Sequence, residues 1–349
     1  MNLLCTYDFP PQHGGIARYH HALVDALAPE CTVFVADRCM HWLRLLPALR
    51  RHARNGVQRV WTSEPLPIGT VAMLHRYWTG IPYTVICHGL DLGRAQQYFR
   101  KRIVLRRVLR GAAHVVVNSA HTAERAVRAG ADATQIRIIH PPVGITPEAY
   151  PSDRGAQVRD THQLQERFLV CTVGRLVRRK GFDVLIQAIA ELSRLHALDR
   201  KPTLAILGDG PEREALTLQA EQLQVDVRWI PHASDATIAA WYAACDVFAM
   251  LPRELPDGDV EGFGIVYLEA GAFGKPVIGA RSGGVPDAVL DGVTGILVAP
   301  DDPFAAAQAL FDIAQHPERG DALGRAGRTR VREHFTLARF RGDVRELLS

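Results

Sequence analysis

Two carboxylates in the second half of the chain flank a glycine turn and a helix start, and the helix start suits an anionic ligand. Glu261 and Glu269 enclose seven residues in the stretch DVEGFGIVYLEAG, where Gly262 and Gly264 permit a turn before an apolar helix expected over 265–272. The N-terminus of such a helix attracts phosphate. Glu269 would lie inside the helix, where a carboxylate requires hydrogen-bond partners. A pair of sugar hydroxyls would supply them, and backbone donors are the alternative.

A basic loop is the second candidate. The stretch VGRLVRRKG, 173–181, lies where an expected strand gives way to an expected helix. Arg175 offers a planar fork of donors and Lys180 a compact point charge, which are complementary ways to hold a diphosphate. Arg178 and Arg179 are expected to be solvated neighbours. The alternative for the whole cluster is an ordinary basic loop.

Glycine turns recur where strands end. In PPQHGGIARY, 10–19, Gly14 and Gly15 let the backbone approach a ligand while the following helix directs free amides at an anion. The stretches LGDGPE (207–212) and PVIGARSGGVPD (276–287) repeat the device. A plain turn explains any one of them. In an open parallel sheet, however, such loops share the carboxyl edge where ligands bind.

A histidine follows one strand of the first half. The stretch CHGLDLG, 87–93, places His88 where it could exchange a hydrogen bond with a substrate. Asp91 could orient an acceptor or cap a helix. A purely structural histidine is the alternative interpretation of His88.

A short basic helix is expected over 99–110, FRKRIVLRRVLR. At about 100° per residue its apolar residues fall on one side: Val104, Leu105, Val108 and Leu109. The cations fall mainly on the other, with Lys101 blurring the separation: Arg100, Lys101, Arg102, Arg106, Arg107 and Arg110. The cationic face is either solvated or attracted to anionic phospholipid headgroups.

These motifs need parallel strands to position them. Short apolar runs alternate with helical patterns from end to end, which is typical of a parallel α/β sheet. In the first half the expected strands are 2–7, 32–36, 83–87, 114–118 and 136–139. In the second half they are 168–173, 204–207, 225–230, 247–250 and 277–279.

The length of the chain predicts two domains. At 349 residues it exceeds the size at which a single hydrophobic core keeps growing. The stretch 140–166 is rich in proline and polar residues and lacks a convincing strand, so it is the expected connection. One domain is therefore expected at 1–150 and a second at 151–335.

Composition narrows the class of protein. With 47% hydrophobic and 22% charged residues the chain has a globular balance, which excludes wholesale disorder. A net charge of +4 is mild, and only Tyr98 and Phe99 flank the basic run with aromatic rings, so no nucleic-acid partner is expected. No metal-ligand spacing joins the cysteines, which indicate reduced, mostly buried thiols: Cys5, Cys31, Cys39, Cys87, Cys171 and Cys245. Without a long apolar stretch or a leader pattern, a cytoplasmic location is expected.

Taken in order, the motifs GGIAR, HGLDL, GRLVRRKG, LGDGPE, EGFGIVYLE and SGGVPD resemble family 4 of the retaining nucleotide-sugar glycosyltransferases. The resemblance covers the chain from Leu4 to about Asp302 and is most specific in the combination of EGFG…E with GR…KG. The stretch DVEGFGIVYLEA is similar to that of bacterial phosphatidylinositol mannosyltransferases and related cell-envelope mannosyltransferases. The family implies a GT-B fold, in which two Rossmann-like domains face each other across a cleft. The first would bind the acceptor and the second the donor, and the C-terminal helix 336–348 would pack back on the first.

The resemblance also implies roles for individual residues. Arg175 and Lys180 would bind the donor diphosphate and Glu269 the ribose. Glu261 would contact the transferred sugar, while His88 would hydrogen-bond that sugar and orient the reacting centre. The remaining donor-binding positions would be Gly15, whose amide faces the distal phosphate, and Gly262, Phe263 and Gly264.

The implied chemistry needs no metal or other cofactor. The leaving nucleoside diphosphate gains negative charge as the glycosidic bond breaks, and fixed Arg, Lys and helix amides stabilise that charge. Asp257 and Asp259 have DxD spacing, but their place before EGFG favours a loop beside the donor site. Retention without an evident nucleophile suggests front-face substitution, in which the leaving phosphate helps deprotonate the acceptor hydroxyl.

The leading hypothesis is a cytoplasmic enzyme, for which attachment to the inner face of the membrane through the basic helix is one of the two interpretations of that helix. It would transfer a hexose, with mannose from GDP-mannose as the first candidate, to a lipid-linked or cell-envelope saccharide. UDP-glucose and UDP-N-acetylglucosamine remain open as donors. A catalytically silent nucleotide-sugar-binding scaffold is the alternative from another class of protein.

Overall fold

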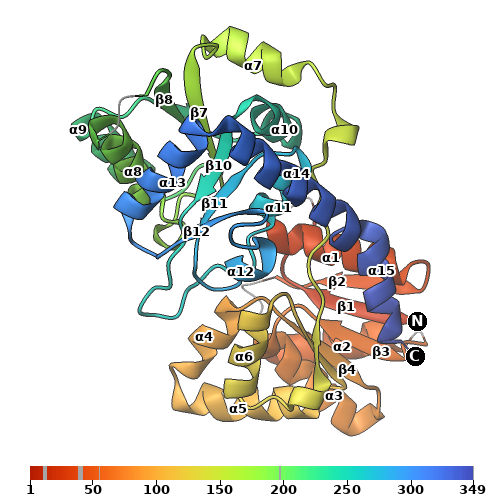
Figure 1. Cartoon of the computed structure of the whole chain (residues 1–349). Helices are drawn as coiled ribbons and strands as arrows, with labels where there is room; N and C mark the ends of the chain where they lie inside the picture. The colour runs from red at the N-terminus through yellow and green to blue at the C-terminus, as the bar shows by residue number, and fades with distance from the viewer. Residues whose placement is uncertain (11–13, 38–41, 55, 196–197, 349) are drawn as a thin grey trace. The chain divides into compact units, whose positions relative to one another are not determined.

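The computed structural model describes residues 1–10, 14–37, 42–54, 56–195 and 198–348. The turn residues 11–13 and Cys39, both part of the sequence interpretation, lie outside the described residues. The chain forms two compact units, which Figure 1 shows as two sheets with their helices. The first comprises Met1–Pro142, Pro256–Gly262 and Phe335–Ser349, and the second Val143–Leu255 and Phe263–His334.

The first unit is built on a six-stranded sheet in the order β2-β1-β3-β4-β5-β6, with every pairing parallel. Its strands are β1 (Asn2–Thr6), β2 (Cys31–Val35), β3 (Arg59–Thr62), β4 (Tyr83–Cys87), β5 (His114–Val117) and β6 (Ile136–Ile138). Its α-helices are α1 (Gly15–Leu27), α2 (Trp42–Ala53), α3 (Thr70–Thr79), α4 (Leu90–Gln96), α5 (Phe99–Gly111), α6 (Ala120–Arg128) and α15 (Leu337–Glu346).

Alternate residues of the central strands β1, β3, β4 and β5 enter two different hydrophobic cores. Leu3 and Cys5 face a core that includes residues of α2, α3 and α5, whereas Leu4 faces a core shared by α1 and α15. Figure 1 shows α15 beside α1. Phe340 of α15 packs edge-on against Tyr19 of α1 with ring centroids 5.2 Å apart. The C-terminal helix is therefore an integral part of the first unit.

The second unit holds a second parallel sheet in the order β12-β11-β10-β7-β8-β9. Its strands are β7 (Arg167–Val173), β8 (Lys201–Leu207), β9 (Val227–Ile230), β10 (Val247–Met250), β11 (Val277–Ala280) and β12 (Gly295–Val298). Its α-helices are α7 (Arg154–His162), α8 (Phe182–Leu195), α9 (Arg213–Gln222), α10 (Asp235–Ala244), α11 (Ile265–Ala272), α12 (Val285–Ala288), α13 (Pro303–Gln315) and α14 (Pro317–His334). The strand order reverses between β7 and β10, which is where doubly wound sheets bind ligands.

In the part of the chain that the structure describes, ten of the twelve strands correspond to predicted ones, and β3 and β12 were missed. The apolar run of β3 contains only Val60 and Trp61 between polar neighbours, too short to stand out, although both side chains are buried in the structure. The strand β12 begins at Gly295, a residue that weakens a strand pattern. Gly295 is required there because an added Cβ would meet the Val277 backbone oxygen at 2.5 Å.

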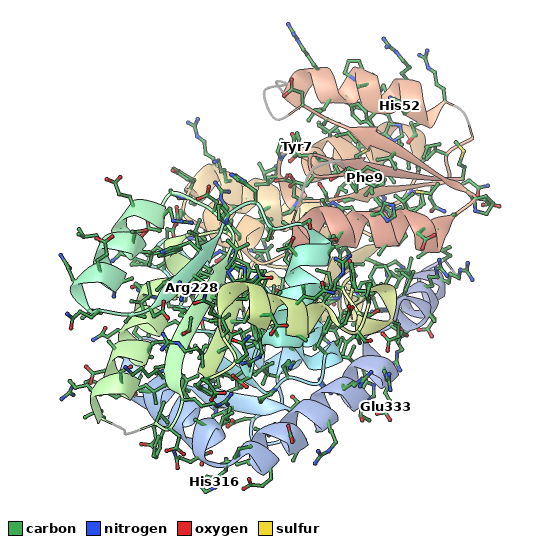
Figure 2. All side chains as sticks on the ribbon, turned by 90° about the horizontal axis from the view of Figure 1, so that it is seen from above. Tyr7, Phe9, His52, Arg228, His316 and Glu333 are labelled. Carbon is green, nitrogen blue, oxygen red and sulfur yellow. The ribbon has the colours of Figure 1, made fainter. Side chains whose placement is uncertain are left out.

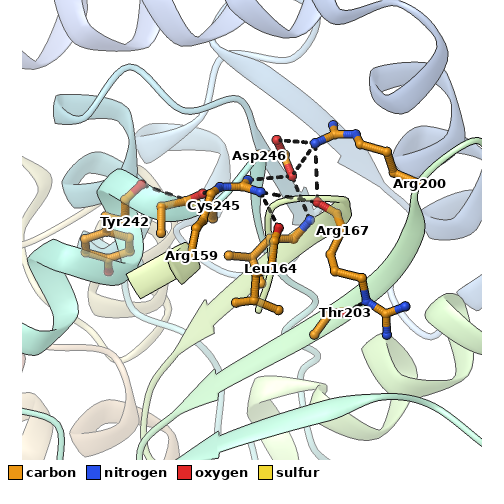
Figure 3. Close-up of polar contacts among 10 residues, drawn as sticks. Arg159, Leu164, Arg167, Arg200, Thr203, Tyr242, Cys245 and Asp246 are labelled. Atoms are coloured by element: carbon orange, nitrogen blue, oxygen red, sulfur yellow. Dashed lines mark hydrogen bonds and ion pairs between the residues drawn. The ribbon is translucent and has the colours of Figure 1, made fainter. Parts of the chain in front are cut away.

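An ion-pair network fastens α7 to the sheet of the second unit (Figure 3). Asp246, which precedes β10, contacts Arg159 of α7 at 2.9 Å and Arg200 at 3.2 Å. The same carboxylate accepts the Leu169 amide of β7 at 2.7 Å. Arg159 also donates to the carbonyls of Leu164 and Ala244, each at 2.8 Å. One carboxylate therefore joins a helix and two neighbouring strands.

We expect Asp246→Asn to destabilise the protein by about 1–3 kcal/mol, because two partly buried guanidinium groups lose their counterion. The matched control is Glu148→Gln, which removes a solvent-exposed ion pair to Arg332 and should cost less than about 0.5 kcal/mol. Urea unfolding followed by tryptophan fluorescence measures both. Equal midpoints for the two variants would contradict a structural role for Asp246.

Candidate functional site

The candidate residues of the first unit follow strands whose carboxyl ends meet at one edge of the sheet. Gly14 and Gly15 come after β1, and Gly15 is the first residue of α1. Gly14 has φ = 140°, a backbone conformation that side chains disfavour. Tyr7 and Phe9, labelled in Figure 2, lie on the described part of the same connection. The free amides at the start of α1 therefore open at the edge where β4 also ends.

His88 follows β4 and is partly buried against α1. Its Nε2 atom lies 3.4 Å from Nε2 of His20, and its ring packs edge-on against Tyr19 with centroids 5.3 Å apart. Burial, reinforced by the neighbouring His20, lowers the pKa of His88 to about 3. His88 is consequently a neutral imidazole near pH 7, suited to hydrogen bonding with a sugar hydroxyl.

Asp91 shapes the turn that carries His88. Its carboxylate accepts the backbone amides of Gly89 at 2.9 Å, Leu92 at 3.0 Å and His88 at 3.3 Å. Burial raises the pKa of Asp91 to about 6, although these amides favour the ionised form and limit the rise. Of the two roles considered for Asp91, the structure supports the second, because the carboxylate organises the first turn of α4.

The loop 256–262, which contains Glu261, belongs to the first unit. Arg125 of α6 donates to the Gly258 carbonyl at 2.9 Å, and Gln97 donates to the Asp257 carbonyl at 2.6 Å. A Cβ added to Gly262 would meet the His88 carbonyl oxygen at 2.3 Å, so only glycine fits this approach. The structure therefore brings together His88 and the segment that carries Glu261.

The DxD-like pair has a local structural role. The Asp257 side chain accepts the Asp259 amide at 3.0 Å, closing a turn around Gly258, whose φ is +77°. This is the geometry of an Asx turn. Asp257 thus shapes the loop that leads to Glu261.

The donor-side candidates lie at the switch point of the second sheet. The loop from Gly174 to Gly181 follows β7, with Arg175 exposed and Lys180 partly buried. A Cβ on Gly181, whose φ is +69°, would lie 1.8 Å from the Leu251 carbonyl oxygen. Leu251 follows β10, so this glycine allows the loops after β7 and β10 to touch.

The LGDGPE segment supports the same basic loop. The Leu176 amide donates to the Asp209 carbonyl at 3.0 Å, and the Leu176 carbonyl accepts the Glu212 amide at 3.1 Å. These two backbone bonds hold the segment beside Arg175. Of the loops predicted to cluster at one sheet edge, LGDGPE and the basic loop are thereby seen in contact within this unit.

An ion pair that sequence reasoning missed also fixes the loop after β10. Arg253 contacts Asp183 at the start of α8 at 2.5 Å and Asp301 at 2.9 Å. Its backbone amide donates to the Arg179 carbonyl at 2.9 Å. The three charged residues are far apart in the sequence and share no motif, so no pattern signals their association.

Glu269 lies inside α11, whose bounds match the predicted helix 265–272. The side chain is 2% exposed, and Tyr242 of α10 donates its hydroxyl to Oε2 at 3.1 Å. Gly264 caps the helix in the left-handed conformation, and Phe263 is buried beside it. The sequence indicated a carboxylate that needs partners, but the tyrosine that supplies one lies on another helix.

The basic helix is present as α5, and it forms a separate surface. Leu105, Val108 and Leu109 are fully buried, whereas all the cations predicted for the outer face are exposed. The helix ends just before β5 begins, so it runs back from the carboxyl edge of the sheet to the opposite edge. Within the described chain, no helix combines the length and apolar character needed to cross a bilayer.

Comparisons with known proteins agree with this geometry. Residues 154–330 match the model for "Glycosyl transferases group 1", and residues 28–142 match the "Glycosyl transferase 4-like domain". A GDP-mannose-dependent alpha-(1-6)-phosphatidylinositol monomannoside mannosyltransferase of Mycolicibacterium smegmatis is 33% identical over 99% of this chain and 98% of its own. The Mycobacterium tuberculosis protein of the same name is 32% identical, covering 98% and 95%.

Solved structures of low sequence identity share the fold. Anabaena Alr3699/HepE in complex with UDP and glucose has a TM-score of 0.82 at 20% identity, over 100% of this chain and 99% of that one. Sucrose-phosphate synthase from Thermosynechococcus elongatus has a TM-score of 0.84 at 22% identity, over 100% and 98%. The predicted α/β class and GT-B fold are confirmed by these matches together with the two parallel sheets.

We expect the His88 imidazole to remain neutral down to about pH 4, because its pKa is lowered to about 3. The unfolded chain binds the same proton with a pKa of about 6.5, so acidification below that value favours unfolding. Asp91, with a raised pKa, contributes with the opposite sign. His88→Asn should therefore lose less stability than the parent between about pH 6.5 and 4.

Urea midpoints across this range measure the difference. His21→Asn is the control because it removes an exposed imidazole from α1, at the position after His20. A His88 that titrates near its ordinary pKa, seen by nitrogen NMR of labelled histidines, would contradict the prediction.

Proposed function

The chain belongs to the glycosyl transferases group 1 family, and on this premise we propose that it transfers mannose from GDP-mannose to a phosphatidylinositol-linked mannoside. The observation that carries the proposal is 33% identity, over 99% of the chain, to a mannosyltransferase with that donor and acceptor. A Corynebacterium glutamicum enzyme whose printed name gives a monoacylated form of the same acceptor is 29% identical over 96% of the chain. The predicted mannosyltransferase subgroup agrees with these relatives.

The second unit binds the donor in this proposal. The loop with Arg175 and Lys180 and the N-terminus of α11 both open at the switch point between β7 and β10. Two cations and a set of free helix amides suit a diphosphate. Glu269, which is hydrogen-bonded to Tyr242, accepts hydrogen bonds from the ribose hydroxyls.

The first unit contributes the groups that act on the sugar. His88 binds the transferred mannose, and Glu261, on the loop whose Gly262 packs against the His88 backbone, contacts the same sugar. Gly15 offers its amide to the distal phosphate at the start of α1. Gly262, Phe263 and Gly264 give the chain the close turn between Glu261 and α11.

The reaction proceeds with retention and without a metal ion. The charge that develops on the departing diphosphate is stabilised by Arg175, Lys180 and helix amides, a role that a divalent cation fills in other enzymes. The bond from the anomeric carbon to the phosphate oxygen breaks while the acceptor oxygen bonds the same face of that carbon. The acceptor hydroxyl proton passes to the leaving phosphate oxygen. Atoms and charge balance without a protein nucleophile.

In this proposal the exposed face of α5 binds the inner surface of the membrane. Its cations can neutralise anionic headgroups, and aromatic side chains accompany them, with Phe99 74% and Tyr98 57% exposed. On α3, Tyr77 is 85% and Trp78 53% exposed. Aromatic rings of this kind suit the headgroup region of a bilayer. The acceptor lipid is presented at the same surface.

We expect GDP and GDP-mannose to raise the melting temperature, and UDP-glucose and UDP-N-acetylglucosamine to have little effect, because ligands that bind the native state stabilise it. With a phosphatidylinositol mannoside acceptor, GDP-mannose should give an α-linked product at an unchanged rate in excess chelator. Thermal shift and NMR of the product measure these outcomes. Stabilisation by uridine nucleotides alone would overturn the donor, and binding without turnover would favour the silent scaffold.

Matched variants assign the donor contacts. Arg175→Ala and Glu269→Gln should each weaken GDP-mannose binding by about tenfold or more, since each removes a charged hydrogen-bonding group. Arg178→Ala changes an exposed arginine of the same loop and should leave binding unchanged. Equal affinities for Arg175→Ala and Arg178→Ala would remove Arg175 from the site.

Charge reversal tests the membrane surface. Replacing Arg100, Lys101 and Arg102 by Glu should reduce partitioning onto vesicles containing phosphatidylinositol by about a hundredfold or more. The loss of three cations at about 1 kcal/mol each accounts for about a hundredfold, and the new carboxylates also repel the anionic headgroups. The control replaces Arg178, Lys201 and Arg325, three exposed cations of the second unit, with the same change in net charge. Vesicle cosedimentation at physiological salt measures both. An equal loss in the two variants would assign binding to net charge rather than to α5.

A further inference from the structure

The buried histidine next to His88 has hydrogen bonds that fix where its proton lies. His20 of α1 is fully buried. Its Nδ1 atom lies 2.8 Å from the Asp8 carbonyl oxygen, an atom that can only accept a hydrogen bond. Nδ1 of His20 must therefore carry a proton.

Thr6 completes this arrangement without changing the conclusion. The Thr6 hydroxyl donates to the Asp8 carbonyl at 3.1 Å, and its oxygen accepts the Asp8 amide at 3.0 Å. Because its own proton is used in this way, Thr6 faces Nδ1 of His20 at 3.1 Å as a second acceptor. Both neighbours of Nδ1 thus require the same protonated atom.

The other ring nitrogen of His20 is then an acceptor. Burial lowers the pKa of His20, so the ring is neutral and Nε2 has a lone pair. That lone pair faces Nε2 of His88 at 3.4 Å, the long end of hydrogen-bonding range. A bond between the two nitrogens requires a proton on His88 Nε2, which leaves the His88 Nδ1 atom unprotonated.

We propose that His20 is a positioning residue that holds His88 in the Nε2-protonated form and so presents Nδ1 as a hydrogen-bond acceptor to a sugar hydroxyl. Donation then runs in one direction, from His88 after β4 to His20 of α1 and from His20 to the Asp8 carbonyl after β1. The catalytic meaning of this inference rests on the proposed function, in which His88 contacts the transferred sugar.

The surroundings of His88 are consistent with this orientation. Tyr19, the other ionisable side chain of α1 against the ring, packs edge-on to it, and burial raises the tyrosine pKa, so it stays neutral. Asp91 of α4 is directed to backbone amides, including that of His88. Among the described residues, no protein atom is hydrogen-bonded to His88 Nδ1, and the residue is only partly buried. That nitrogen is available to a ligand hydroxyl, which would donate its proton.

Nitrogen NMR of histidine-labelled protein reads these protons directly. We expect His88 to be protonated on Nε2 and His20 on Nδ1 in the ligand-free protein. His20→Leu replaces the imidazole by an apolar side chain of similar size and so removes the acceptor. His88 should then shift toward a mixture of its two neutral forms. His20→Gln returns an oxygen acceptor and should restore the Nε2-protonated form. His21→Leu, at the exposed neighbouring position, is the control.

Turnover gives a second measurement. His20→Leu should lower kcat/KM for mannosyl transfer by about tenfold, the value of one well-placed hydrogen bond, and His20→Gln should recover most of it. A His88 protonated on Nδ1 in the parent protein, or nitrogen signals of His88 unchanged by His20→Leu, would overturn the inference.

The two measurements separate this inference from the proposed function. If mannosyl transfer is absent in the parent but the tautomers are as expected, the positioning stands and the assigned reaction fails. If transfer occurs and the tautomers differ, the reverse holds. Should His20→Leu fail to fold, the parent spectrum and His20→Gln still decide.

Discussion

The adjacency of β7 and β10 in the second sheet is the constraint on which the candidate site of that unit depends. These strands are neighbours although β8 and β9 come between them in the chain, so the connections after β7 and β10 diverge to opposite faces and leave room at their common edge. Gly181 lets the first connection touch the Leu251 carbonyl of the second. Arg253 then fastens the same contact by pairing with Asp183 at the start of α8. These contacts of Gly181 and Arg253 hold the loops together, so the candidate cations Arg175 and Lys180 are not needed for that purpose.

Buried polar groups that are already satisfied hold the remaining site residues in place. The Tyr242 hydroxyl fixes Glu269, the amides after β4 fix Asp91, and the Asp8 carbonyl fixes His20. An unsatisfied group at any of these positions would cost about 1–3 kcal/mol, so each hydrogen bond also selects one orientation. Positional precision at the site therefore follows from the same rule that stabilises the core.

Local chemistry made most elements of the candidate site predictable from the sequence, and long-range pairing limited the rest. A few consecutive residues determine each of three elements: the helix 265–272, the basic loop around Arg175 and the turn at His88. Sequence pattern and propensity are therefore enough to predict them. Folding alone brings three partners to the site, and no motif in the sequence predicts them: Tyr242, Arg253 and His20. The strands β3 and β12 were missed for a related reason. Their short runs are strands because neighbouring strands pair with them and helices bury them.

The two units differ in the electrostatics of their candidate groups, and burial explains the difference. Next to the first sheet, His88 and His20 are driven to their neutral forms by desolvation, so their specificity can come only from the direction of hydrogen bonds. In the second unit, Arg175 is exposed and Lys180 only partly buried, so solvent can stabilise these cations. A neutral sugar and a charged diphosphate require these opposite conditions. The proposed donor, a nucleotide-sugar, carries both groups, and the candidate residues at each sheet edge provide one of the two conditions.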